Sequence, residues 1–396
     1  MPESIIIQVG QCGNQIGQKF WEKAVTEHAS YNKNQIFDES FSTFFRNVDS
    51  RNGISNISFE KKEKIVELRG RGILVDMEEG VINQIKNSFV GELFDNNQII
   101  SSNSGSGKDK NKNNRNKVLN FLTGNNWAVG YNVYGKEFND LIIETVRKQT
   151  EYCDGLQSFF LISSLGGGTG SGLGSYINEL LCTEYPEVFK FSSVIFPAKN
   201  DDVITSPYNS VLALNKLINH VDCVLPIENN SLLDIFEKIE KSNPDFSQSS
   251  LATNVEELKK NKKLKNFDGM NNIVANLLNN LTSSMRFEGK MNVDINDITT
   301  NLVPFPRLKF LLSSMTPLYT LKDVRVAPRS IDQMFLDAFT KETQLIKTDG
   351  KSGTYLACAL IVRGQGIALS DIRRNIDKIS KSLKFVSWNQ ESWKTG

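Results

Sequence analysis

The chain has 396 residues, of which 39% are hydrophobic, and its 46 basic and 45 acidic side chains leave a formal net charge of +1. This length and apolar content predict up to two domains with a large buried core, and the balanced charge gives no overall field that favours nucleic acid or an anionic membrane. The five cysteines are scattered without a Cys-x-x-Cys spacing, and no apolar run has membrane-spanning length, which argues against a disulfide framework, a zinc site or a membrane segment and favours a reducing compartment.

Three short β-branched runs, at residues 5–9, 71–77 and 159–165, predict buried strands, and each is followed by a glycine or acidic turn and a helical pattern. Repeated strand, turn and helix units predict an α/β fold with a doubly wound parallel sheet, whose ligands bind at the carboxyl ends of the strands. Two polar stretches, about 101–117 and 240–266, lack apolar periodicity. We expect them to be surface insertions, although the lysine run in the second also fits a nucleic-acid patch.

Residues 163–174, SSLGGGTGSGLG, lie between a predicted strand and a helical pattern. Such a turn brings backbone N–H groups and a positive helix end around one point, which suits a phosphate chain, and the hydroxyls of Thr169 and Ser171 can add donors. The segment lacks the Gly-Lys ending of the Walker loop and does not match G-x-G-x-x-G, so a conventional dinucleotide enzyme is disfavoured. A serine-hydrolase turn also fails, because position 169 is Thr and only His28 and His220 could serve as bases.

GGGTGSG, together with GQCGNQIG at residues 10–17, resembles the signature of the tubulin family, and the resemblance continues through NLVPFPRLKF to FVSWNQESWKTG outside the two insertions. The segments FFRNVD, LVDMEEGVIN and SWNQESWKT are most like the epsilon subfamily. The resemblance implies a GTP-binding domain over residues 1–266, a core helix over 267–287 and a smaller α+β intermediate domain over 288–396. It also implies that this last domain is incomplete at its C-terminus and that the C-terminal helical region of the family is absent.

The resemblance further implies a site for GTP or GDP with Mg²⁺. Asp76 and Glu78 follow a predicted strand and are suited to holding hydrated magnesium. Ser206 and Phe267 stand where alpha- and beta-tubulins carry a glutamate and a tyrosine. The residues that match nucleotide-binding positions of the family are Gly10, Gln11, Cys12, Gln15, Asn125, Gly166, Gly167, Gly168, Thr169, Gly170, Ser171, Asp202, Asn229, Phe267 and Asn271.

The segment MNVDINDITTNL matches the loop that, in tubulins, enters the nucleotide site of the next subunit. Asn292 and Asp294 match residues shared by that loop, and Asp297 takes the position of a catalytic glutamate in alpha-tubulin. A carboxylate there could orient and polarise the water that attacks the γ-phosphorus. A helix-start aspartate that only caps is the alternative interpretation.

We therefore expect an epsilon-type tubulin, a GTP-binding constituent of the microtubule cytoskeleton whose GTP hydrolysis would be completed in trans by a neighbouring subunit. The resemblance implies a role at centrioles, the centrosome or the basal bodies of cilia, in the formation or stability of compound microtubules. The expected partners are other tubulins and centriolar or basal-body proteins, without nucleic acid or membrane, in the cytoplasm. The leading alternative is a non-polymerising GTP-binding adaptor that caps or bridges other tubulins without turnover.

Overall fold

The computed structural model describes most of the chain, in segments that include both ends of every helix and strand named below. They are residues 3–32, 39–49, 51–57, 65–102, 125–198, 203–242, 255–287, 289, 291–318, 330–348, 353–364, 366–389 and 393–396. The first expected insertion lies almost wholly outside them, as does Asp202.

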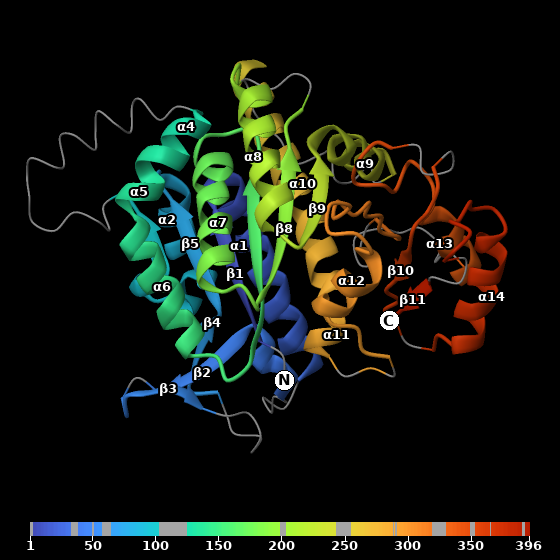
Figure 1. The fold of residues 1–396 in the computed structure, drawn as a ribbon, viewed down its shortest axis with the longest axis horizontal. Helices are drawn as coiled ribbons and strands as arrows, with labels where there is room; N and C mark the ends of the chain where they lie inside the picture. Colours follow the sequence, from blue (N-terminus) through green and yellow to red (C-terminus); the bar gives the residue numbers. More distant parts are fainter. Residues whose placement is uncertain are drawn as a thin grey trace, which may run out of the picture.

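A six-stranded parallel sheet in the order β6-β5-β1-β7-β8-β9 forms the centre of the fold (Figure 1). The three strands predicted from sequence are β1, β5 and β7, which confirms the doubly wound α/β class. The chain builds outward from β1 through β5 to β6, and then returns to the other side of β1 with β7. The switch point of the sheet therefore lies between β1 and β7, where the carboxyl ends open a crevice for ligands. The strands are β1 (Glu3–Val9), β5 (Gly72–Asp76), β6 (Ile99–Ser101), β7 (Leu156–Ser164), β8 (Phe189–Phe196) and β9 (Cys223–Glu228).

Helices cover both faces of the sheet, because its central strands are apolar on both sides. On one face Ile6, Leu74 and Phe160 join a core with α1 (Gly10–Tyr31), α2 (Glu79–Lys86), α9 (Asn229–Ser242) and α10 (Val255–Leu281). On the other face the core includes α6 (Asn139–Glu151) and α7 (Gly174–Glu184), with α8 (Ser206–His220) over β8 and β9. Figure 1 shows α6, α7 and α8 in front of the sheet. Short elements join these layers: α4 (Trp127–Val129), η5 (Gly130–Tyr134), α5 (Gly135–Glu137) and η6 (Thr169–Leu173).

The core helix begins earlier than we expected. Helix α10 starts at Val255 rather than at residue 267, so residues 255–266 of the expected second insertion are helical. Lysine, glutamate and leucine, which fill this stretch, are good helix formers, and they extend the helix without an apolar stripe. The helix ends at Leu281 and is followed by the short α11 (Ser283–Arg286).

A small antiparallel sheet in the order β3-β2-β4 lies after α1, and our sequence analysis did not predict it. Its strands are β2 (Phe45–Asp49), β3 (Ile54–Ile57) and β4 (Glu67–Gly70), with the 3-10 turns η1 (Glu39–Thr43), η3 (Phe89–Leu93) and η4 (Asn96–Gln98) nearby in the chain. None of the helices in the described segments is both long and apolar enough to cross a membrane.

The C-terminal unit, residues 291–396, is a smaller α+β structure that attaches to the open edge of the large sheet. The amide of Val224 in β9 donates to the carbonyl of Lys309 at 2.8 Å, and Leu311 donates back to Val224 at 2.9 Å. In Figure 1 this unit occupies the orange and red side of the molecule. Its elements are α12 (Ile295–Leu302), α13 (Ile331–Asp337), β10 (Cys358–Leu360), α14 (Leu369–Ser380) and β11 (Trp393–Thr395), with β10 and β11 paired in parallel.

Candidate functional site

Two turns interlock at the switch point of the sheet. Gly10, which starts α1 directly after β1, has a φ of +75°, a conformation that favours glycine. A Cβ built on Gly10 would lie 3.0 Å from the backbone nitrogen of Gly170, and one on Gly13 would collide with the carbonyl oxygen of Ile162 at the end of β7. The β1–α1 turn therefore packs directly against the loop after β7, and glycine is required for that approach.

The loop after β7 has one tightly packed side and one open side. A Cβ on Gly170 would lie 2.9 Å from the Ser164 carbonyl oxygen, and one on Gly172 would collide with the Trp127 carbonyl. A Cβ on Gly167, in contrast, would meet nothing closer than 3.8 Å. The open side at Gly167 is where a ligand can reach the loop backbone, next to the uncapped start of η6.

The hydroxyl of one expected donor already has a partner inside the loop. The Ser171 hydroxyl is buried and donates to the carbonyl of Gly167 within its own loop. The Thr169 side chain is half-buried and lies beside Gly10. In this structure Thr169 therefore remains a candidate hydroxyl donor, whereas the Ser171 hydroxyl stabilises the loop, because its short side chain reaches a carbonyl four residues earlier.

The segment that begins at Asn125 packs against the glycine loop after β7. Asn125 has a φ of +60°, the one positive value for a non-glycine residue in the described segments. Its carbonyl accepts hydrogen bonds from Thr205 at 2.6 Å and from Asn209 at 2.7 Å. Asn209 also donates to the Gly166 carbonyl at 2.9 Å and accepts from the Trp127 amide at 2.9 Å. Asn209 thus holds the Asn125 segment against the glycine loop.

Sequence reasoning missed Asn209 and also Asn14, which has a similar role on α1. The buried Asn14 amide donates to the carbonyl oxygens of Gly10 at 3.0 Å and Val75 at 3.1 Å, which ties the β1–α1 turn to the end of β5. The only available signal was that both asparagines stand beside motif residues, in GQCGNQIG and SPYNS.

Asp76, the last residue of β5, is a buried carboxylate with one oxygen that can still accept a hydrogen bond or bind a cation. Its Oδ1 accepts the Glu78 amide at 3.2 Å, but its Oδ2 has no hydrogen-bond partner in the described part of the chain. Burial raises the pKa of Asp76 to about 7. An orphaned carboxylate oxygen at the carboxyl edge of the sheet fits a hard cation, and exposed Glu78 lies two residues away. No group of three or more His, Cys, Asp or Glu in the described segments is placed to hold a metal ion.

The residues expected beside the sugar and base come from three helices on one face of the sheet, α1, α9 and α10. Asn271 on α10 donates to the Gln15 side chain on α1 at 3.5 Å, although 256 residues separate them. Phe267 lies one turn before Asn271 and is 41% exposed, so its ring remains available for stacking. Asn229 is half-buried at the start of α9, directly after β9.

The first turn of α1 contributes two further expected residues. Gln11 is exposed at the second position of the helix. Burial raises the pKa of the Cys12 thiol to about 12, so this residue stays a thiol at neutral pH and serves for packing rather than as a nucleophile. Together, the observed loops form a glycine-lined, amide-rich rim with one carboxylate pair, which is an arrangement suited to a phosphate chain and a divalent cation.

Comparisons with known proteins agree with this geometry. Residues 3–237 match the GTPase domain of the Tubulin/FtsZ family, and residues 306–396 match the Tubulin C-terminal domain. The chain is 52% identical over 401 residues to the tubulin epsilon chain of Homo sapiens and 51% identical over 402 residues to that of Mus musculus. Both alignments cover all of this chain and 80% of the relative. A nucleomorph tubulin alpha chain of Guillardia theta is 30% identical over 408 residues, which cover all of this chain and 79% of the relative.

The chain belongs to the tubulin family. Membership confirms the predicted family and its α/β class, and the high identity to epsilon chains agrees with the subfamily suggested by the sequence. The tubulin GTPase domain implies that the ligand is a guanine nucleotide. Membership in the tubulin family also makes the chain a cytoskeletal protein.

The tubulin loop expected to act in trans lies in the C-terminal unit, at the start of α12. Asn292 accepts the Gly289 amide at 3.1 Å, and Asp297 accepts the Asp294 amide at 3.4 Å as part of a capping box. Asp297 also lies 3.7 Å from the Lys394 ammonium, yet its side chain is 46% exposed. Figure 1 shows α12 below the arrowheads of β8 and β9, away from the carboxyl edge of the sheet.

Proposed function

We propose that this tubulin binds GTP or GDP with Mg²⁺ at the carboxyl edge of its parallel sheet. The observation that carries the proposal is the open face at Gly167, beside the interlocked Gly10 and Gly170 turns and the orphaned Asp76 oxygen. Backbone amides of the two turns would bind phosphate oxygens. Gln15, Phe267 and Asn271 would bind the sugar and base, together with Asn229.

Asp76 and Glu78 would hold Mg²⁺, whose chemistry when bound is to neutralise charge on the terminal phosphates. Asn125, fixed with a positive φ by Thr205 and Asn209, would contact the terminal phosphate. The assigned residues thus divide into a phosphate set on the glycine turns, a cation set after β5 and a base set on α1, α9 and α10.

For hydrolysis we propose that the α12 start of one subunit completes the site of the next. Asp297 is half-exposed, and it lies in the C-terminal unit, whereas the glycine loop lies in the sheet domain. Its carboxylate is therefore available to a neighbouring molecule. Its carboxylate would orient the attacking water and accept its proton, with Asn292 and Asp294 shaping the same loop. Turnover would then require assembly.

A second candidate function is favoured by the contacts that Asp297 already makes. Its carboxylate caps α12 and faces Lys394, which is what a purely structural aspartate does. On this reading the protein is a GTP-binding adaptor that caps or bridges other tubulins without turnover.

The cellular role that we propose is in centrioles or basal bodies, in the formation or stability of compound microtubules, with other tubulins and centriolar or basal-body proteins as partners. It is supported by the 52% identity to an epsilon chain over the whole of this chain and by the sequence segments that resemble the epsilon subfamily.

The test is nucleotide content followed by turnover. Protein purified gently in Mg²⁺ should release guanine nucleotide on denaturation, measured by anion-exchange chromatography. GTP hydrolysis per subunit should then rise with protein concentration, or on addition of other tubulins. Well-folded protein without nucleotide would contradict the site, and concentration-independent turnover would contradict the trans arrangement.

A further inference from the structure

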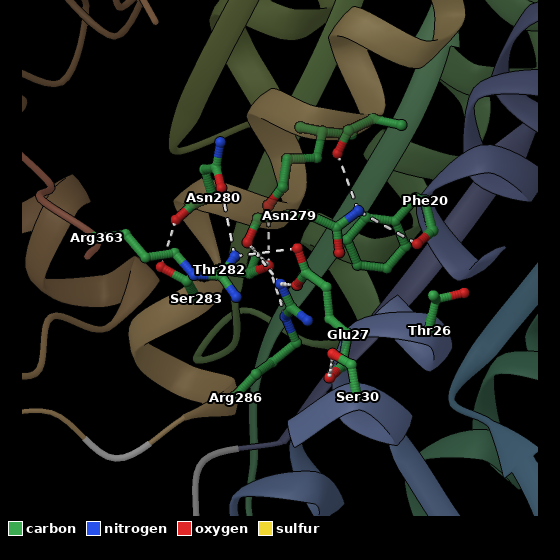
Figure 2. Close-up of polar contacts among 12 residues, drawn as sticks. Phe20, Thr26, Glu27, Ser30, Asn279, Asn280, Thr282, Ser283, Arg286 and Arg363 are labelled. Atoms are coloured by element: carbon green, nitrogen blue, oxygen red, sulfur yellow. Dashed lines mark hydrogen bonds and ion pairs between the residues drawn. The ribbon is translucent and has the colours of Figure 1, made fainter. Parts of the chain in front are cut away.

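A cluster far from the nucleotide site joins three parts of the chain. It consists of Glu27 and His28 near the end of α1, Arg286 and Phe287 at the end of α11, and Arg363 after β10; we call it the Glu27 cluster. Figure 2 shows Glu27 reaching from α1 toward Arg286 and Arg363, which approach it from different elements. Because these elements belong to the sheet domain, the core-helix end and the C-terminal unit, the cluster connects all three.

One carboxylate in this cluster serves two guanidinium groups. Glu27 Oε2 accepts from Arg286 at 2.9 Å, and Glu27 Oε1 accepts from Arg363 at 3.1 Å. Both guanidinium groups also lie 5.2 Å from the centre of the Phe287 ring, and His28 stacks on that ring at 4.6 Å. The carboxylate and the ring are therefore contacted by both arginines.

The two arginines differ in what their loss would do. Arg286 is 0% exposed, and it also donates to the Asn279 carbonyl at 2.6 Å, so removing its partner would leave a buried charge. Arg363 is 39% exposed, and besides Glu27 it reaches only the Asn280 side chain, at 3.4 Å, among the hydrogen bonds seen in the described segments. Removing Arg363 thus leaves the Arg286–Glu27 pair intact and removes only the link from Glu27 to the C-terminal unit, which stays attached at β9.

The backbone beside Arg363 leads directly to the loop assigned to hydrolysis. The Val362 amide donates to the Gly396 carbonyl at 2.8 Å, and the Gly396 amide donates to Leu360 at 3.0 Å. Gly396 packs so closely on buried Val293 that a Cβ would collide with its methyl group. Val293 lies between Asn292 and Asp294, so a short chain of contacts runs from Glu27 to the start of α12.

We propose that Arg363 is a positioning residue: its bonds to Glu27 and Asn280 hold strands β10 and β11, and through them the 292–297 loop, in a fixed place relative to the sheet domain. The part that concerns hydrolysis rests on the proposed function, whereas the positioning itself does not. The loop is held at a distance from its own nucleotide site, and its placement determines how it meets the neighbouring subunit.

The test is hydrogen exchange on the full chain, with three variants. Arg363→Gln replaces the charged guanidinium with a shorter, neutral amide. Arg363→Lys keeps the charge, and Arg374→Gln is the control. Arg374 is an exposed arginine of the same unit whose partners, Asp332 and Asp371, also lie within that unit. Deuterium uptake is followed by mass spectrometry in residues 291–302 and 393–396, with β1 and β7 as internal references.

Arg363→Gln should speed exchange in both segments on the order of fivefold, since a half-exposed ion pair and a cation–π contact are lost. Arg363→Lys should restore most of the protection, and Arg374→Gln should not change these segments. Unchanged exchange in 291–302, equal acceleration in β1 and β7, or the same effect from Arg374→Gln would each overturn the proposal.

A second measurement links the cluster to turnover. Assembly-dependent GTP hydrolysis by Arg363→Gln should fall severalfold while its affinity for GTP stays at the parental value, because the nucleotide site is untouched. If hydrolysis falls only in proportion to GTP affinity, the positioning role is wrong. If the parent protein shows no turnover at all, the proposed trans hydrolysis fails, and the exchange data alone decide the role of Arg363.

Discussion

The first turn of α1 leaves space and polar groups available for a ligand, whereas near its end the side that carries Glu27 and His28 packs against other parts of the protein. At the Gly10 end, a Cβ on Gly167 would meet nothing closer than 3.8 Å, and Asp76 Oδ2 has no partner in the described segments. Near His28, in contrast, Glu27 lies between two arginines and the aromatic ring of Phe287 fills the space beside them. One helix thus has a ligand-facing end and a protein-facing end, and substitutions at the two ends should affect different properties.

The sharpest way to break the ligand-facing end is Gly167→Val. A Cβ there has no close neighbour, so the protein should fold with parental stability, while the side chain fills the space needed by phosphate. We expect nucleotide affinity to fall on the order of 100-fold or more, since several charge-assisted hydrogen bonds are lost. Fluorescent GTP titration measures this. The control is Gly155→Val, an exposed glycine at which a Cβ would meet nothing within 4 Å, and this variant should bind normally. Normal binding by Gly167→Val would place the ligand elsewhere.

Asp297 tests whether the ligand-facing end is completed by another subunit. Asp297→Asn keeps an oxygen that can accept the Asp294 amide, whereas Asp297→Ala removes the cap as well. If the carboxylate is catalytic, both variants should lose assembly-dependent hydrolysis by about 100-fold and bind GTP normally. Only the alanine variant should also unfold more easily, by about 1 kcal/mol. Turnover retained in Asp297→Asn but not in Asp297→Ala would identify a helix cap and favour the adaptor function.

Asp76→Asn distinguishes the contribution of the cation to GTP affinity from that of the phosphate contacts at the ligand-facing end of α1. The amide is nearly the same size, but it cannot supply the negative charge that a hard cation prefers. With excess Mg²⁺ we expect GTP affinity to fall about tenfold, the lower range for altering a metal site. In EDTA the variant and the parent should bind alike, because neither then uses the cation. A loss of affinity that persists in EDTA would mean that Asp76 supports the fold of the site rather than the metal.

The two ends of α1 were also unequal in what the sequence could predict. Strands β1, β5 and β7 follow from their β-branched runs, and a doubly wound sheet binds ligands at the carboxyl ends of its strands, so the edge that holds the ligand-facing end was predictable. The strand order that sets the switch point came from the structure. Most of its residues came from the family resemblance. Asn209 was missed because a buried amide that bonds carbonyl groups of two distant loops has no pattern of its own along the chain.

The protein-facing end could not have been predicted in this way. Glu27 and Arg363 are 336 residues apart, and no spacing rule joins two charges across that distance. The early start of α10 was missed for a related reason, since residues 255–266 are favourable to a helix by propensity but lack the apolar period on which the prediction relied. The small sheet β2–β4 was missed because its strands are short and their sequences mix polar and apolar residues.

The smallest effect that we predict concerns His28 at the protein-facing end, and it appears as a pH dependence of stability. Burial, with the nearby charges of Arg286 and Arg363, lowers the pKa of His28 to about 3. The folded protein therefore binds fewer protons here than the unfolded chain, so this residue gives full stability above about pH 6.5 and costs stability as the pH falls from there toward 3. Between pH 7 and pH 6 the free energy of unfolding should fall by about 0.7 kcal/mol, from the pKa of His28 in the folded protein and in the unfolded chain.

His28→Phe keeps an aromatic ring beside Phe41 and Phe287 and cannot be protonated. Urea unfolding at pH 7 and pH 6 should therefore show a loss of stability that is smaller in the variant by that amount. Taking the difference between variant and parent cancels the other titrating groups. An equal loss in both proteins would mean that His28 can be protonated within the folded protein, and the enclosed character of this end of α1 would then be wrong.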